Sequence, residues 1–315
     1  MTGFTGSKVS VIGAGSVGTS LAYAALIRES AGEVALYDIA KDKVEAEVLD
    51  LAHGTQFTQS SIIGGADPAV LEGSDLVVIT AGAKQQPGQT RLELAGTNVR
   101  ILEQLLPEVQ ERAPGAVIML VTNPVDVLTA IARDITGLPS TQVFGSGTVL
   151  DTSRLRWLLG KRLGVATSSV HAHIVGEHGD TEFPLWSSAT VGPVPLLDWE
   201  GPNRLSDGEL DDIAVEVRDA AYRVIAGKGA TNYAIGLSAA RIVEAVLGDE
   251  QAVLPVSTVL DDYHGISGVA MSVPCIVGAG GPVPVAGVRF SAEEEGKLAA
   301  SAEAIRGSLE SVAGK

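Results

Sequence analysis

The sequence predicts an α/β protein with a doubly wound parallel sheet in its N-terminal half and an α+β unit in its C-terminal half. Up to about residue 145, short runs rich in β-branched residues alternate with helical patterns, as in parallel sheets with helices on both faces. Beyond that point, short strands separated by Gly and Pro are mixed with long helices. We therefore expect two domains, residues 1–145 and 146–315.

The N-terminal elements follow in order. Four strands are expected at 8–12, 33–38, 75–80 and 116–121, and the last two are almost wholly apolar, as in strands buried on both faces. Helices are expected at about 16–29, 41–52, 91–112 and 124–136. Pro124 falls in the first turn of the last helix, where a missing N–H is tolerated.

The C-terminal elements are more varied. We expect helices at 150–163, 205–226, 230–247 and 292–312, and strands at 171–175, 252–260, 268–277 and 283–290. Short strands continue from 176 to about 195. The last helix is amphipathic and has several Glu residues in its first turn, where the helix dipole favours negative charge.

The composition excludes several classes of function. The chain has 22 Lys and Arg against 38 Asp and Glu, a formal charge of −16, so we expect no nucleic-acid partner and no acidic membrane surface. The single Cys275 excludes internal disulfides and fits a reducing compartment. The long uncharged stretches at 9–27 and 265–288 contain too many Gly, Ser, Thr or Pro residues for a membrane span. No signal peptide is evident, and we expect a cytoplasmic protein.

A glycine motif marks a dinucleotide site. Gly13, Gly15 and Gly18 form G-x-G-x-x-G between the first strand and the first helix, a pattern that allows a tight turn and close approach of a pyrophosphate. The pyrophosphate would lie at the positive end of the helix. Asp38 follows the second strand, where a carboxylate binds ribose hydroxyls and repels a 2′-phosphate. The motif predicts NAD rather than NADP.

Ionisable residues suited to carbonyl reduction occur in the segments around this site. His178 lies in a glycine-flanked turn after a strand, and Asp151 and Arg154 share one face of a helix. Asn123 lies at the carboxyl end of a strand, and Arg91 follows a glycine-containing loop. Hydride delivery to a ketone builds negative charge on oxygen, which an imidazolium and a guanidinium stabilise.

At these residues the chain resembles the lactate/malate dehydrogenases over essentially its whole length. The resemblance rests on the glycine motif and on TNPVD at 122–126, DTSR at 151–154 and GEHGD at 176–180. It implies that His178 is the proton donor and acceptor, that Asp151 orients it, and that Arg154 binds the substrate carboxylate. By the same resemblance Arg91 polarises the carbonyl, and Asn123 contacts the carbonyl oxygen and the nicotinamide.

The resemblance also implies a cofactor set and a substrate. The residues expected to contact NAD are Gly13, Gly15, Ser16, Val17, Gly18, Asp38, Ala81, Gly82, Thr122, Asn123 and Ile235. Within the family, the residue six places before the loop arginine contacts the far end of the substrate and determines which substrate is accepted. Here it is Gln85, as in lactate-specific members, whereas malate-specific members carry Arg. Thr231 resembles the lactate type as well, and it would crowd the methyl side of pyruvate.

We therefore expect interconversion of pyruvate and (S)-lactate with NAD. A malate or other 2-hydroxyacid dehydrogenase is the nearer alternative. A non-catalytic dinucleotide sensor and an NAD-dependent glycosidase remain from other classes, since a fold alone does not settle function. His171, His173 and His178 raise the idea of a metal site, but no H-E-x-x-H spacing or nearby cysteine supports one, and we expect none.

A regulatory site follows from the same resemblance. In bacterial members activated by fructose 1,6-bisphosphate, an arginine two places after the substrate arginine and a histidine seven places before the catalytic histidine hold phosphate across a subunit interface. Arg156 and His171 occupy these positions. We therefore expect a homotetramer in which this anion relieves repulsion between the cationic groups.

Overall fold

The computed structural model describes residues 6–83, 91–201 and 203–313, and for residues 91–93 and 313 it describes the backbone only. Its centre is a parallel sheet in the order β3-β2-β1-β4-β5-β6. The strands are β1 (Lys8–Ile12), β2 (Glu33–Tyr37), β3 (Ser61–Gly65), β4 (Leu76–Ile79), β5 (Val117–Leu120) and β6 (Val143–Gly145). This is the order of doubly wound dinucleotide-binding folds, which bind ligands outside the carboxyl ends of the strands where the order reverses, between β1 and β4.

Two strands of this sheet, β3 and β6, were not expected from the sequence. The five residues of β3 are half-buried or exposed at the far edge of the sheet, so they lack the apolar run that marks a central strand. The strand β6 has three residues and is too short to give a pattern. The four expected strands are confirmed, each within a residue of its bounds.

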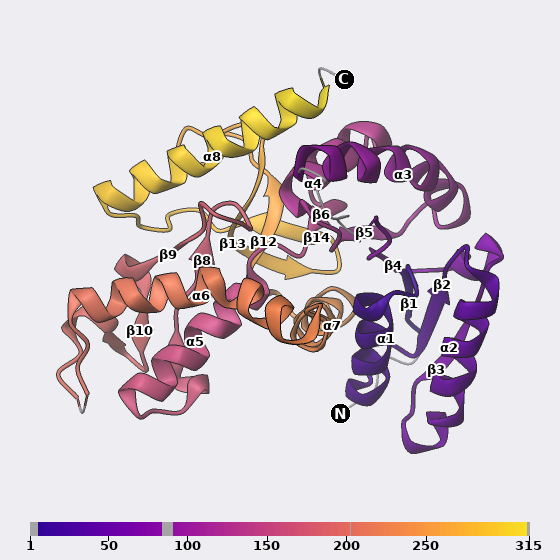
Figure 1. Cartoon of the computed structure of the whole chain (residues 1–315), viewed down its shortest axis with the longest axis horizontal. Helices are drawn as coiled ribbons and strands as arrows, with labels where there is room; N and C mark the ends of the chain where they lie inside the picture. Colours follow the sequence, from indigo (N-terminus) through magenta and orange to yellow (C-terminus); the bar gives the residue numbers. More distant parts are fainter. Residues whose placement is uncertain (1–5, 84–90, 202, 314–315) are drawn as a thin grey trace.

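Helices cover both faces of the sheet (Figure 1). The first four are α1 (Ser16–Arg28), α2 (Lys41–His53), α3 (Arg91–Arg112) and α4 (Val125–Thr136). Alternate side chains of a strand point to opposite faces. Leu76 and Val78 of β4 accordingly pack in the core under α1 and α7 (Tyr233–Leu247), whereas Val77 and Ile79 pack in the core under α3 and α4. Pro124 is the N-cap of α4, with an extended ψ of 111°, and not a first-turn residue as expected.

The C-terminal half begins with α5 (Val149–Leu163), which supports two small sheets. One sheet pairs β7 (Val170–His171), β10 (Thr190–Val191) and β11 (Val194–Pro195), and the other pairs β8 (Ile174–Val175) with β9 (Phe183–Pro184). The expected strand at 171–175 is therefore split. The division falls where side chains of α5 bind the backbone: Arg156 donates to the carbonyl of Ala172, and Thr152 accepts from the N–H of Ile174.

The remaining strands join the N-terminal sheet. They are β12 (Ala252–Val259), β13 (Ala270–Gly278) and β14 (Gly281–Pro284), all antiparallel to their neighbours. Ser257 of β12 pairs with Gly145 of β6 and extends the sheet to nine strands. The unpaired edge that β6 would otherwise present is thereby covered. The expected strand at 283–290 is wrong in its extent, because pairing ends at Pro284.

The long helices α6 (Asp207–Lys228) and α8 (Ala292–Ala313) complete the fold, and α8 lies along one side of the molecule (Figure 1). A capping box sets the start of α6, since Ser206 accepts from the N–H of Glu209 while the Glu209 carboxylate accepts from the N–H of Ser206. Short 3₁₀ helices lie at Thr55–Phe57, Pro68–Leu71, Thr167–Ser169, Trp186–Ser188 and Leu196–Asp198. Within the described ranges, no helix is long and apolar enough to cross a membrane.

Candidate active site

Three strand ends meet at the edge of the sheet where a ligand is expected. Thr80, after β4, donates from its hydroxyl to the carbonyls of Ile12 and Gly13 at 3.0 and 3.1 Å. Thr122, after β5, donates from its hydroxyl to the carbonyl of Ala81 at 2.7 Å. These bonds join the ends of β1, β4 and β5, and they place the segment that contains Ala81 and Gly82 beside the glycine turn.

The glycine turn fits a dinucleotide. Gly13 has a φ of +108°, and a Cβ there would lie 2.7 Å from the N of Ala81. A Cβ on Gly18 would lie 1.9 Å from the carbonyl oxygen of Gly13. Positions 13 and 18 must therefore be glycine for the turn to pack closely against α1 and the segment after β4. A Cβ on Gly15 would meet no described atom within 4 Å. Because no side chain caps α1 at Gly15, the N–H groups of its first turn, which includes Ser16 and Val17, can bind a pyrophosphate.

Asp38 follows β2 and is fixed by two backbone N–H groups. Its Oδ2 accepts from Ala14 at 2.7 Å, and its Oδ1 accepts from Ala40 at 2.9 Å. Each carboxylate oxygen can accept a further hydrogen bond, so the side chain can still bind ribose hydroxyls. The contact with Ala14 places this carboxylate directly against the glycine turn.

Asn98 is a polar residue of this edge that the sequence analysis did not single out. It is 1% exposed, its Oδ1 accepts from the N–H of Ala83, and its Nδ2 donates to the carbonyl of Asn123. It therefore ties the segment after β4 to the segment after β5. Its signal in the sequence is an amide on the apolar face of α3, at helical spacing from the buried Ala95 and Leu102.

The structure brings together two of the predicted catalytic residues, His178 and Asp151, and the predicted substrate-binding Arg154. The Nδ1 of His178 lies 2.7 Å from Oδ2 of Asp151, and Nη1 of Arg154 lies 2.5 Å from Oδ1 of the same carboxylate. Asp151 is 1% exposed, so its pairing with Arg154 is not a surface ion pair. Both oxygens of one buried carboxylate are thus engaged by a cation and an imidazole.

This arrangement stabilises the imidazolium. Burial alone would lower the pKa of His178, but the charge and hydrogen bond of Asp151 outweigh it and raise the pKa to about 9. Burial alone would raise the pKa of Asp151, yet His178 and Arg154 hold it below its usual range. The pair is therefore an imidazolium and a carboxylate at neutral pH, which leaves Nε2 of His178 with a proton to give.

Asp126 holds the backbone of the catalytic histidine from the other side. Its Oδ2 accepts from the N–H of His178 at 2.7 Å, and its Oδ1 accepts from the hydroxyl of Ser257 at 2.5 Å. Burial raises the pKa of Asp126 to about 6, although both hydrogen bonds oppose the shift. The sequence analysis included Asp126 in a motif but gave it no role.

A third anchor comes from α8. The hydroxyl of Ser301 accepts from the N–H of Glu177 at 2.6 Å and lies 3.0 Å from the hydroxyl of Thr181. Thr181 also donates to the carboxylate of Glu177 at 2.6 Å. Ser301 is fully buried, so the turn at 176–181 is fixed to the C-terminal helix. A serine on a helix gave no signal in the sequence that it would contact the turn around His178.

A cavity of about 610 Å³ opens in front of these residues. Its lining includes Asn123, Asp151, Arg154 and His178, together with residues of α3, α6 and α8. Thr231 and Ile235 are not among its lining residues; Thr231 lies just before α7, and Ile235 packs on the core beneath α1. Gln85 lies outside the described residues. Arg91 begins α3, and its side chain also lies outside the described part of the chain.

The predicted regulatory pair is not in direct contact. Arg156 points from α5 toward Ala172 and His173, with Nη2 3.1 Å from Nε2 of His173. His171 is exposed on β7. Burial, together with the charges of Arg156 and His171, lowers the pKa of His173 to about 4. The structure thus places His173 between the two predicted residues, a position that the sequence analysis did not assign to it.

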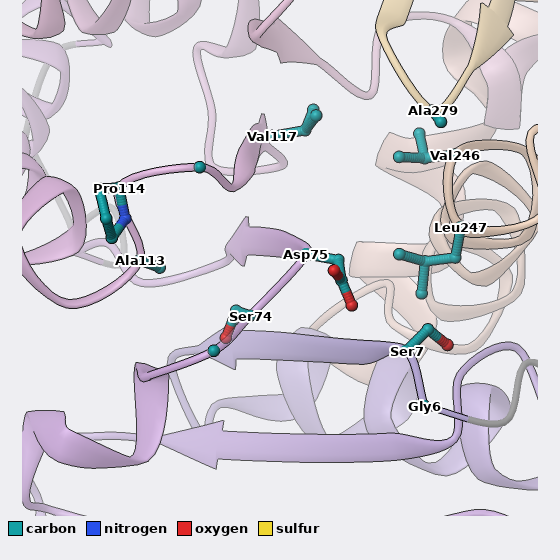
Figure 2. Close-up of a pocket in the computed structure, with 12 residues that line it drawn as sticks. Gly6, Ser7, Ser74, Asp75, Ala113, Pro114, Val117, Val246, Leu247 and Ala279 are labelled. Carbon is teal, nitrogen blue, oxygen red and sulfur yellow. The ribbon is translucent and has the colours of Figure 1, made fainter.

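Figure 2 shows a second cavity, of about 590 Å³, at the opposite edge of the sheet. Ser7 precedes β1 and Asp75 precedes β4, so this cavity lies at the amino ends of the strands. Among its described lining residues, Asp75 alone carries a charge, and its Oδ2 accepts from the N–H of Lys8 at 2.8 Å. His178, Asp151 and Arg154 line the first cavity and not this one.

The fold and the first cavity define the class of protein, an NAD-dependent oxidoreductase. Two family models match: the lactate/malate dehydrogenase NAD-binding domain at residues 7–145 and the lactate/malate dehydrogenase alpha/beta C-terminal domain at residues 148–315. The chain belongs to the lactate/malate dehydrogenase family.

Individual relatives are similar over nearly the whole chain. An L-lactate dehydrogenase of Bifidobacterium animalis subsp. lactis is 49% identical over 304 residues, 95% of each chain. An L-lactate dehydrogenase of Clostridium botulinum (strain Langeland) is 43% identical over 310 residues, 98% of each chain. The solved structure of a minor L-lactate dehydrogenase from Enterococcus mundtii has a TM-score of 0.93 at 38% identity, and it covers 98% of this chain and 99% of that one.

Proposed function

We propose that this protein is an L-lactate dehydrogenase that interconverts pyruvate and (S)-lactate. The observation that carries the proposal is the buried Asp151–His178 pair, which lines one cavity together with Arg154 and Asn123. NADH, bound at the glycine turn, supplies the hydride. The names of the relatives support the same substrate.

Each side chain has a distinct role in the proposal. His178 gives its proton to the substrate oxygen, and Asp151 keeps the imidazole charged and oriented until that moment. Arg154 binds the substrate carboxylate through the guanidinium nitrogens that face away from Asp151. Asn123 and Arg91 stabilise the oxygen as it becomes negative. Asp126 and Ser301 hold the backbone on either side of His178.

The choice of pyruvate over oxaloacetate rests on Gln85 and Thr231. A dicarboxylate opposite a neutral amide would leave a buried charge without a partner, at a cost of several kcal/mol. The alternative is that malate or another 2-hydroxy acid is the natural substrate. Comparing the rates at which the enzyme turns over pyruvate and oxaloacetate distinguishes the two possibilities.

The test is oxidation of NADH with a panel of 2-oxo acids, for the parent and for Gln85→Arg. We expect the parent to prefer pyruvate, and the variant to shift toward oxaloacetate by orders of magnitude because the new charge pairs with the second carboxylate. The proposal fails if the parent reduces oxaloacetate more efficiently than pyruvate. The role of Gln85 fails if the folded variant keeps the parent's ratio.

We further propose that fructose 1,6-bisphosphate activates the enzyme at Arg156 and His171. The support is the position of Arg156 beside the segment that contains His171: its guanidinium donates to the carbonyl of Ala172 and lies 3.1 Å from Nε2 of His173, on a chain of charge −16. A multivalent anion would bind these groups where symmetry-related subunits bring them together.

The pyruvate concentration at half-maximal rate, measured with and without fructose 1,6-bisphosphate in the parent and in His171→Ala, tests this site. Activation of the parent that is reduced in His171→Ala is the expected result. No response in the parent between pH 5 and 8, or an undiminished response in the variant, defeats it.

We also propose a cytoplasmic homotetramer whose chains divide at residue 145 into a cofactor domain and a substrate domain. In support, helices α1 and α7 pack side by side (Figure 1), and both carry large apolar side chains that are exposed in the single chain. These side chains are Tyr23, Ile27, Tyr233 and Leu237. Sedimentation equilibrium with and without fructose 1,6-bisphosphate tests the assembly, and a monomer under both conditions contradicts it.

A further inference from the structure

A second carboxyl side chain lies beside the His178 imidazole. Glu182 immediately precedes β9, in the same turn as His178, and it lines the active-site cavity. A carboxylate oxygen of Asp151, a ring nitrogen of His178 and a carboxylate oxygen of Glu182 all lie within 4.8 Å of one another. Asp151 has both oxygens hydrogen-bonded, whereas Oε1 of Glu182 is buried and has no hydrogen-bond partner in the described part of the chain.

The groups around Glu182 shift its pKa in opposite directions. Burial and the Asp151 carboxylate raise the pKa of Glu182 to about 8, while His178, Arg154 and, from α6, Arg218 lower it. Asp126 on α4 faces His178, and Glu177 and Asp180 line the same cavity. The lining residues described on α3 and α8 carry no titratable side chain.

We propose that Glu182 is a positioning residue for proton transfer: its buried carboxyl lies beside the imidazole, and the charge that it carries when ionised strengthens the hold of His178 on its proton. The proposal rests on the proposed function, because it takes His178 as the proton donor to pyruvate. It assigns no contact with substrate to Glu182. The effect is electrostatic and acts through the imidazolium.

Ionisation of Glu182 then has opposite effects on the rates of pyruvate reduction and lactate oxidation at high pH. Pyruvate reduction needs the imidazolium, so a negative Glu182 preserves it to higher pH. Lactate oxidation needs the neutral imidazole, so the same charge delays it. The proton of Glu182 leaves to solvent before that of His178, and the two groups titrate as a pair.

The kinetic test compares the parent with Glu182→Gln and Glu182→Asp. Gln has the shape of the neutral acid, so below pH 7 we expect the Gln variant to reduce pyruvate within about twofold of the parent rate. At higher pH the upper pKa in kcat/KM should be lower by about one pH unit, the size expected for losing a charge some 5 Å away. The Asp variant keeps the charge and should keep the parent's upper pKa.

Glu216→Gln is the matched control, since it removes one negative charge on α6 from a pair with Arg162 at the surface. Its profile should superimpose on that of the parent. An unchanged upper pKa in Glu182→Gln overturns the proposal. An equal shift in the Gln and Asp variants also overturns it, because loss of fit rather than loss of charge would then be the cause.

Infrared difference spectroscopy of the parent needs no variant and no turnover. We expect the C=O stretch of a protonated carboxyl to disappear between pH 7 and 9, separately from Asp126, which titrates lower. The band should be absent from Glu182→Gln. If no such band is lost in this range, the proposal is wrong even where the variants fail to fold. Failure of the proposed function shows differently, as no pyruvate-dependent oxidation of NADH at any pH.

Discussion

Two histidines close together in the sequence have their charges set in opposite directions. His178 lies against Asp151 and has its pKa raised to about 9, whereas His173 lies against Arg156 and has its pKa lowered to about 4. Burial lowers the pKa of both. At His173 burial is the largest cause and Arg156 adds to it, whereas at His178 the carboxylate of Asp151 outweighs burial and reverses the sign of the shift.

One helix supplies the partners of both histidines. Asp151 and Arg154 are three apart on α5 and lie on one face, whereas Arg156, two places further, points to a different side because each residue turns the helix by about 100°. A short stretch of α5 thus contacts His178 through Asp151 on one side and His173 through Arg156 on the other. The difference shows that sequence proximity to a histidine says little about its protonation state.

The largest expected effect comes from removing the charge that distinguishes His178. Asp151→Asn should lower kcat/KM for pyruvate by about a thousandfold or more, because the amide neither orients nor stabilises the imidazolium. Asp219→Asn, an exposed change on α6, is the control and should leave the rate unchanged. A folded Asp151→Asn protein with more than a tenth of the parent activity would contradict the role assigned to the pair.

Arg154→Lys should have the next largest effect. It removes one of two parallel charged hydrogen bonds to the substrate carboxylate, at about 1.5–3 kcal/mol, so KM for pyruvate should rise by about ten- to a hundredfold. Arg162→Lys, on the same helix, should leave KM at the parent value. If kcat falls and KM does not change, Arg154 acts on the reacting oxygen and not on the carboxylate.

The raised pKa of His178 sets the pH dependence of the parent enzyme. The value of kcat/KM for pyruvate should stay level up to about pH 9 and then fall by about tenfold per pH unit as the imidazolium is lost. For lactate it should rise with pH and level off near the same value. A break close to the ordinary histidine pKa of about 6.5 would show that Asp151 does not set it.

The smallest effect concerns His173 and is on stability. Because its folded-state pKa of about 4 lies below the unfolded value, the unfolded chain binds more protons and stability falls as the pH drops below about 6.5. His173→Gln keeps an acceptor for Arg156 but cannot be protonated. Between pH 8 and pH 5 the variant should lose about 2 kcal/mol less stability than the parent. Equal losses, measured by thermal unfolding, would place His173 in contact with solvent.

Much of the site could be predicted from local patterns. The glycine turn is contiguous, and Asp151 and Arg154 are three apart on one helix, so their placement follows from helix and turn geometry alone. Asp126, Glu182 and Ser301 could not be assigned in this way. Asp126 and Ser301 contact the turn of His178 across many residues of chain, and Glu182, four residues after His178, lies in an irregular segment where no spacing rule applies. Nor could the sequence show that Arg156 contacts His173.

The sequence by itself determined the alternation of strands and helices, the glycine turn and the direction of the parallel sheet, because these depend on neighbours within one element or one connection. Only the tertiary structure decided that Ser257 pairs with Gly145 to extend the sheet and that Asp151 meets His178 at 2.7 Å. Such contacts join segments from different elements, and their geometry is set by how whole layers pack. The protonation state of His178 depends on that packing, because the pKa shift that a carboxylate causes falls off steeply with distance.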